Sequence, residues 1–186
     1  MKPIKTSLLV SLMLSSTLYA QEVPQNIIDT GDKLSKTLLQ QLGSKLKNEI
    51  KTNGLISAAK FCNSNAITLT EEVNLAQIEG QSVKRISLKE RNLANTPKPD
   101  EALVLQNMQK MLEHKTLPPY IIEKEGKIYK YYKPLVINKS VCLKCHGDIS
   151  MNKELSSFMH EYYPDDKAVG YKMGDLRGAV LVEIKE

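Results

Sequence analysis

The feature that most constrains this chain is a Cys-x-x-Cys-His motif formed by Cys142, Cys145 and His146. On a helix, two thiols at this spacing lie one turn apart and point to the same side. They can add to the two vinyl groups on one edge of a porphyrin, which is how this motif attaches a c-type haem. The imidazole that follows is then placed under the ring, free to bind the iron. The motif therefore predicts one covalently bound haem c.

Three other roles for closely spaced cysteines compete with haem attachment. A zinc site would need two further ligands from Cys62, His114, His146 and His160. A thiol–disulfide pair needs a low thiol pKa rather than an adjacent histidine, and a plain structural disulfide is the third alternative. We favour haem because the complete motif lies in a chain that carries an export signal.

Residues 1–20 have the pattern of a secretory signal peptide. Lys2 and Lys5 give a positive start, residues 8–14 are apolar, and Ala20 precedes polar residues. The apolar run is too short to span a bilayer, and no later stretch approaches about 18 apolar residues. We expect a periplasmic protein with no membrane span in its mature chain. An oxidising compartment also agrees with covalent haem attachment.

Charge and composition limit the partners and the core. The formal net charge of the chain is +5 and falls by two when Lys2 and Lys5 are removed. This charge is too small to indicate a nucleic-acid partner, and lysines interspersed with acidic residues are typical of a solvated surface. The chain has no Trp and two Phe, so a haem would supply much of the aromatic bulk of the core.

Residues 21–53 are predicted to form a long amphipathic helix, and residues 54–186 the haem domain. Asn53 and Gly54 end the helix. Packing against the domain is the simpler role, and a homodimer through this helix is the alternative because the apolar stripe is long. The stripe repeats at three- and four-residue steps and consists of Ile27, Ile28, Leu34, Leu38, Leu39, Leu42, Leu46 and Ile50.

A second helix is predicted over about residues 55–73, with an unusual face of small residues. Ala58, Ala59, Cys62 and Ala66 share this face, which lets the helix backbone approach something flat and large. Cys62 is the one thiol left when the porphyrin takes the other two. It is either a buried, inert cysteine or, as a thiolate, the second axial ligand of the iron. Rival ligands are His114, His160, Met108, Met111, Met151, Met159 and Met173.

Two arginines are candidates for contacts with the haem propionates. Arg85 lies in a short predicted strand, and Arg91 in the following loop, where Pro97 and Pro99 exclude a helix. A guanidinium can bind a carboxylate in a fork. The alternative is that each arginine pins the loop.

The rest of the chain mixes helices and strands. A helix is predicted over residues 99–115, a hairpin over residues 120–132 around Gly126, a short helix over residues 153–159 and a final strand over residues 178–184. Helices followed by a hairpin indicate an α+β fold with an antiparallel sheet. Strands on both sides of the haem motif argue against the small helical c-type electron carriers.

Several residues and motifs follow one another along the chain: Cys62; Arg85-x-Ser87-Leu88-Lys89-x-Arg91-Asn92 with Asn95-x-Pro97; Cys142-Leu143-x-Cys145-His146-Gly147; Tyr163-Pro164-x-Asp166-x-Ala168-x-Gly170-Tyr171; and Gly174-Asp175-Leu176-Arg177-Gly178. In these residues the chain resembles the family of single-haem c-type sensor domains with a PAS-like fold. The resemblance implies a central antiparallel sheet of about five strands flanked by helices, and Cys/His ligation of the iron by Cys62 and His146. Leu93 departs from the family, which usually has proline there.

This ligand pair predicts a redox or diatomic-gas sensor. A thiolate stabilises ferric iron, and reduction weakens its bond, so a position opens for CO, NO or a neighbouring side chain. Movement of Cys62 would then pull its helix and signal to a redox or signalling protein that the sequence does not identify. The alternative is a soluble periplasmic c-type electron carrier, whose ligands stay constant. A peroxidase-like enzyme would need a distal acid–base pair, and we find no catalytic constellation in the sequence.

Overall fold

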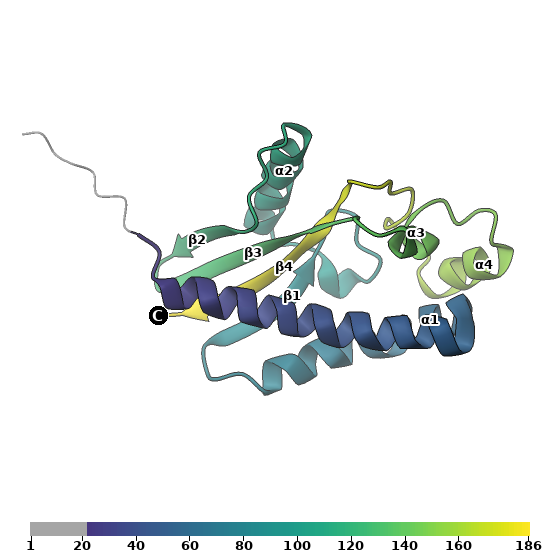
Figure 1. Ribbon diagram of the computed structural model, residues 1–186, viewed down its shortest axis with the longest axis horizontal. Helices are drawn as coiled ribbons and strands as arrows, with labels where there is room; N and C mark the ends of the chain where they lie inside the picture. Colours follow the sequence, from purple (N-terminus) through teal and green to yellow (C-terminus); the bar gives the residue numbers. More distant parts are fainter. Residues whose placement is uncertain (1–21) are drawn as a thin grey trace, which may run out of the picture.

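The computed structural model describes residues 22–186, which form an α+β fold with one long N-terminal helical element and one antiparallel sheet (Figure 1). This confirms the predicted α+β class with an antiparallel sheet and a long N-terminal helix, whereas the predicted signal peptide lies outside the described residues. No helix in the described part is long and apolar enough to cross a bilayer. The elements in chain order are α1 (Gln25–Leu75), β1 (Gln81–Ile86), the short 3₁₀ helix η1 (Leu93–Asn95), α2 (Pro99–Glu113), β2 (Ile121–Glu125), β3 (Ile128–Val136), α3 (Ser140–His146), α4 (Lys153–Tyr162) and β4 (Leu176–Lys185).

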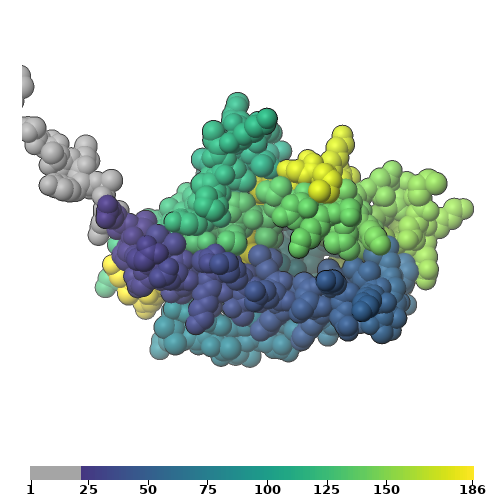
Figure 2. Space-filling model, in the orientation of Figure 1, coloured from purple at the N-terminus to yellow at the C-terminus, as the bar shows by residue number. Residues whose placement is uncertain are grey.

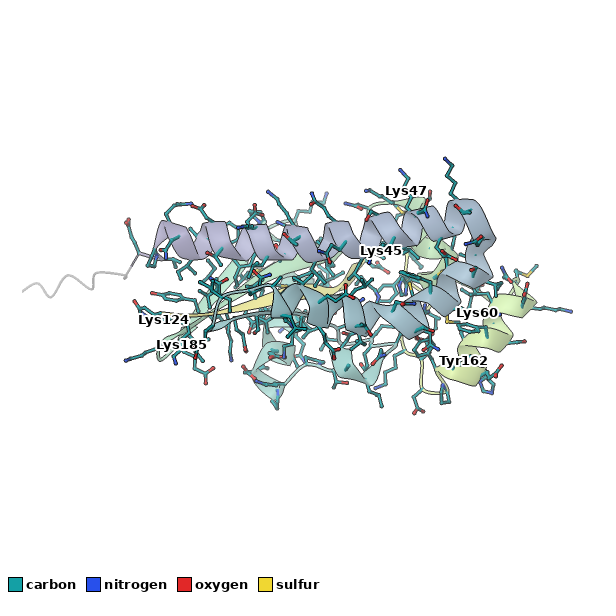
Figure 3. The ribbon with its side chains drawn as sticks, turned by 90° about the horizontal axis from the view of Figure 1, so that it is seen from below. Lys45, Lys47, Lys60, Lys124, Tyr162 and Lys185 are labelled. Atoms are coloured by element: carbon teal, nitrogen blue, oxygen red, sulfur yellow. The ribbon has the colours of Figure 1, made fainter. Side chains whose placement is uncertain are left out.

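The element α1 is a helical hairpin with two arms that meet at Gly54 (Figures 1 and 3). Gly54 has φ 83° and ψ −178°, a backbone conformation that glycine adopts without a Cβ clash. The Glu49 carboxylate spans the turn by accepting hydrogen bonds from Asn53 Nδ2 (2.8 Å) and Ser57 Oγ (2.5 Å). The predicted helix end at Asn53 and Gly54 is therefore confirmed, and the second arm folds back beside the first.

The sheet has the strand order β1-β4-β3-β2, and all neighbouring strands are antiparallel. The expectation of about five strands is wrong for the described residues, which form four. The connection between α4 and β4 is long enough for another strand, but none of it pairs with the sheet. Instead, the backbone of this connection forms hydrogen bonds with the end of α3. The Tyr171 N–H donates to the His146 carbonyl (2.9 Å) and the Gly170 N–H to the Gly147 carbonyl (3.0 Å).

Helices cover both faces of the sheet, and each face has its own core. α1 packs on one face, and the buried residues there are Ile27, Leu34, Leu38, Val73, Val83, Tyr129, Tyr131, Val180, Val182 and Ile184. α2 packs on the other face, where Val104, Leu105 and Met108 meet Ile86, Tyr132, Ala179 and Leu181. At the end of the first arm, the apolar residues Leu46 and Ile50 line a cavity instead. The apolar stripe of this arm is therefore directed at the sheet and the cavity of its own chain. The homodimer stays a prediction.

Two glycines of the first arm give a matched test of this packing. A Cβ added at Gly31 would overlap the Tyr131 ring, whereas a Cβ at Gly43 would meet nothing within 4 Å. We expect Gly31→Ala to lower the free energy of unfolding by about 1–3 kcal/mol through overpacking. Gly43→Ala should raise it by about 0.5–1 kcal/mol, because alanine is the better helix former. Urea unfolding measures both, and equal effects would contradict the helix–sheet contact.

Candidate functional site

A cavity of about 640 Å³ lies where the two arms of α1 face the ends of β1, β3 and β4 and the helices α3 and α4. Figure 2 shows the surface hollowed between α1 and the segment around α3 above it. Its wall is largely apolar, with Leu39, Leu46, Ile50, Leu135 and Ile137 among the lining residues. Binding cavities for small molecules and cofactors have volumes of about 300–1,000 Å³, so the space suits a large, mostly apolar ligand.

The structure brings all six residues that the sequence singled out to the wall of this one cavity. They come from three separate parts of the chain: the second arm of α1, the segment around β1, and α3. The residues are Cys62, Arg85, Arg91, Cys142, Cys145 and His146.

The Cys-x-x-Cys-His motif forms α3 and ends it. Cys142 and Cys145 lie one helical turn apart, and the Gly147 N–H caps the turn by donating to the Leu143 carbonyl (2.9 Å). Both thiols are free and partly buried, as is that of Cys62. Burial raises the pKa of the Cys145 thiol, so this thiol is protonated at neutral pH in the chain without a ligand.

The His146 imidazole is held in one tautomer. Its Nδ1 lies 2.9 Å from the Ala168 carbonyl oxygen, which can only accept, so Nδ1 donates its hydrogen. Burial, with the charges of Arg177 and Arg91, lowers the pKa of His146 to about 3, so the ring is neutral at pH 7. The lone pair is therefore on Nε2, which is the arrangement that a metal-ligating histidine uses.

A network of hydrogen bonds around Arg91 fixes the loop that carries Ala168. We call it the Arg91 clamp, and it joins Arg91, Asp166 and the carbonyls of Cys145 and Ala168. Arg91 Nε contacts Asp166 Oδ2 (2.9 Å), and Nη2 donates to Cys145 O (2.7 Å) and Ala168 O (3.3 Å). Asp166 Oδ1 in turn accepts from the Ala168 N–H (2.8 Å). Arg91 therefore ties α3 to the loop that orients the imidazole.

Cys62 enters the cavity from the second arm of α1. Ala58, Ala59 and Ala66 line the wall beside it, as the small-residue face predicted. Burial raises the pKa of the Cys62 thiol, with a smaller contribution from Cys145, while Arg85 and Arg91 act in the opposite direction. The small neighbours leave room for a flat group against this arm.

Among the rival sulfur and imidazole groups, Met159 alone lines the cavity within the described residues. Met108 is a residue of α2 that is buried against the sheet, and Met111 of the same helix is partly buried outside the cavity. His114, His160, Met151 and Met173 are exposed. Residues 22–186 contain no group of three or more His, Cys, Asp or Glu arranged to hold a metal ion, which is what the zinc alternative required.

The sequence reasoning missed Arg177 as a site residue. Arg177 lines the cavity together with Arg85 and Arg91, so all three arginines of the chain meet there. Tyr163, Asn92 and Lys133 are further lining residues that were not singled out. The sequence feature that could have pointed to Arg177 is the scarcity of arginine in a lysine-rich chain, because a residue type used only three times is a candidate for a specific role.

Fold and site together define an α+β protein with a cavity, open to the surface, that combines three free thiols, a neutral imidazole and basic side chains. The chain belongs to the Tll0287-like family, which matches residues 6–185. A solved structure with a similar fold is the crystal structure of the cyanobacterial heme-protein Tll0287, with a TM-score of 0.61 and 24% sequence identity. The match covers 89% of this chain and 98% of that chain. No curated protein matches the chain.

Proposed function

We propose that this chain is an exported, periplasmic protein that binds one haem c covalently and acts as a redox or diatomic-gas sensor. In this proposal Cys142 and Cys145 form the thioether bonds, and His146 and Cys62 are the axial ligands. The observation that carries it is the shared cavity, because Cys62 and the Cys-x-x-Cys-His motif line the same space although they are far apart in sequence.

The residues present fit a haem in four respects. The cavity is large and mainly apolar, two thiols one turn apart border it, and the neutral His146 ring keeps its Nε2 lone pair. The wall beside Cys62 consists of small side chains that let a flat ring approach. Helices on both faces of the antiparallel sheet are compatible with the PAS-like domain that forms part of this proposal.

Haem iron, when bound, supplies a one-electron couple and axial coordination positions. Cys62 is the ligand whose hold depends on the oxidation state, because an anionic sulfur binds ferric iron more strongly than ferrous iron. His146 would keep its orientation in both states, because its Nδ1 is held by the Ala168 carbonyl. The proposal therefore assigns a fixed ligand to α3 and a releasable one to α1.

Release of Cys62 would act on the second arm of α1. The start of this arm packs on α4 through Ala59, which contacts a cluster of Leu155, Phe158 and Met159. Its end is anchored to β1, since Asn74 Nδ2 donates to Val83 O (3.1 Å) and Asn74 Oδ1 accepts from Val83 N (2.7 Å). The segment between these two anchors would then have two arrangements, one with Cys62 bound to the iron and one with Cys62 released. A sensor requires such a pair of states.

A pyridine haemochrome spectrum of the exported, purified protein tests the proposal. We expect a c-type spectrum that survives acid–acetone extraction, and a Cys142→Ala/Cys145→Ala variant whose haem is extracted. A protein that carries no haem would contradict the proposal. Fast reversible electron exchange with an unchanged ligand spectrum in both oxidation states would instead favour the electron carrier.

A further inference from the structure

The wall of the cavity carries a surplus of positive charge. Its described lining residues include no Asp or Glu, and the basic ones are Arg85, Arg91, Lys133, Lys139 and Arg177. Two of these cations have acidic partners just outside the cavity, since Lys133 Nζ contacts Asp32 Oδ1 (3.0 Å) and Arg91 contacts Asp166. Lys139 is exposed to solvent. Arg85 and Arg177 remain, partly buried and without an ion pair within residues 22–186.

A β-bulge aims Arg177 at the cavity. Leu135 of β3 pairs with Gly178 and Val136 pairs with Leu176, so Arg177 is the extra residue of β4. Such bulges redirect a side chain and are frequent beside functional sites. Gly178 makes the bulge possible, because its φ of 154° and the close approach of the Ile86 carbonyl exclude a Cβ.

The Arg177 guanidinium is held by hydrogen bonds from one of its nitrogens, Nη1, and keeps donors on its other nitrogens. Its Nη1 donates to Ser87 Oγ (2.6 Å) and to the Lys89 carbonyl (3.0 Å), and its guanidinium lies 5.4 Å from the centre of the Tyr171 ring. Apart from the Tyr171 hydroxyl, which lies beside the guanidinium, no described residue accepts a hydrogen bond from its Nε or Nη2. The side chain is thus held in place with donors to spare.

Arg85 has the same property on the neighbouring strand. Its Nη2 donates to the Ala66 carbonyl (3.2 Å), one turn beyond Cys62, while its buried Nε has no partner in the described part of the chain. Burial, and to a smaller extent the charge of Arg177, lower the pKa of Arg85, but a guanidinium stays protonated at neutral pH. Neither guanidinium has an ion-pair partner in the described residues, although the carboxylates of Glu90 and Asp166 interact with Arg177 at longer range. An anion in the cavity would offset the repulsion between the two neighbouring cations.

We infer that Arg85 and Arg177 form a carboxylate-binding pair that takes the two propionates of the porphyrin, whereas Arg91 serves the clamp. This inference rests on the proposed function and deepens it. A guanidinium binds a carboxylate through two parallel hydrogen bonds. Arg177 keeps donors on Nε and Nη2 for such a pair. Arg85 keeps Nη1 and the second hydrogen of Nη2, whereas its Nε is buried away from the open space. The class of ligand that fits this part of the cavity is a large apolar ring with two carboxylates. The sequence had named Arg85 and Arg91 as candidates for the propionate contacts, and in this inference Arg177 takes the place of Arg91.

Metal-free protoporphyrin IX tests the pair without any contribution from axial ligands. The probe is added to the full mature chain purified without haem, and binding is followed by porphyrin fluorescence. The diamide of the same porphyrin, which lacks the two charges, is the comparison. We expect the diacid to bind at least ~10-fold more tightly than the diamide, because charge-assisted hydrogen bonds are strong in a partly buried site.

Variants assign the effect to the two arginines. The double variant Arg85→Gln/Arg177→Gln should bring the ratio of the two affinities close to one. If the double variant does not fold, Arg177→Gln alone serves instead, and it should lower the ratio about threefold. Lys36→Gln is the control for the loss of one positive charge, since the Lys36 side chain is exposed and lies outside the cavity wall, and its ratio should stay unchanged. An unchanged ratio in the arginine variants, or an equal loss in Lys36→Gln, would overturn the inference while leaving porphyrin binding intact. Failure of both porphyrins to bind would overturn the proposed function itself, and the inference with it.

Discussion

The Cys62→Ser variant is expected to lose the low-spin ferric absorption spectrum of the haem-loaded protein. A serine hydroxyl is a much weaker ligand for ferric iron than a thiolate. The side chain nonetheless keeps nearly the same size, so the small-residue wall beside Ala58 and Ala66 should be preserved. The measurement is the ferric spectrum of the purified variant at neutral pH.

The reduction potential should rise in the same variant. A thiolate stabilises ferric iron, and its removal therefore makes reduction easier. Axial ligands set haem potentials over a span of about 0.8 V, so we expect a rise on the order of 0.1 V or more in a spectroelectrochemical titration. A low-spin spectrum and a potential like those of the unchanged protein would remove Cys62 from the iron.

Met159→Leu is the control, because Met159 is the other uncommitted sulfur on the described wall of the cavity. The exchange roughly conserves volume, and a cost below about 1.5 kcal/mol is expected. The spectrum of this variant should not change. If Met159→Leu alters the spectrum and Cys62→Ser does not, Met159 is the sixth ligand and the releasable thiolate is excluded.

Local chemistry made the main parts of the site predictable from the sequence. The spacing of Cys142, Cys145 and His146 indicates one helical turn, and α3 has that turn. Asn53 and Gly54 indicated the end of a helix, and the left-handed backbone of Gly54 breaks α1 there. The odd thiol on a small-residue face directed attention to Cys62, which lies at the cavity.

Features that depend on pairing between distant segments were not predictable. The bulge at Arg177 arises where the register of β3 and β4 shifts, and no property of Arg177 itself encodes that shift. The role of Arg91 depends on a loop that follows α4, since Asp166 and the Ala168 carbonyl are its partners. A single arginine in a loop gives no sign of such contacts. The central place of β4 in the sheet was likewise invisible in the sequence.

The Asp166→Ala variant is expected to cause a large loss of stability, about 3–5 kcal/mol in the free energy of unfolding. The side chains of Arg91 and Asp166 are only 12% and 9% exposed. Removing the carboxylate leaves a nearly buried guanidinium without a counterion, which is the costly way to break such a pair. It also removes the acceptor of the Ala168 N–H. Urea unfolding of the chain without haem measures the loss.

Two further variants separate charge from geometry in this prediction. Asp166→Asn keeps an oxygen that can accept from the Ala168 N–H, so its cost should be smaller than that of alanine and reflect mainly the lost ion pair. Lys36→Ala removes an exposed pair with Asp32, in which the Lys36 side chain is 59% exposed, and should change stability by less than about 1 kcal/mol. If Asp166→Ala costs no more than Lys36→Ala, the clamp does not hold the loop. The Ala168 carbonyl must then be positioned by other contacts, and the orientation of His146 would not depend on Arg91.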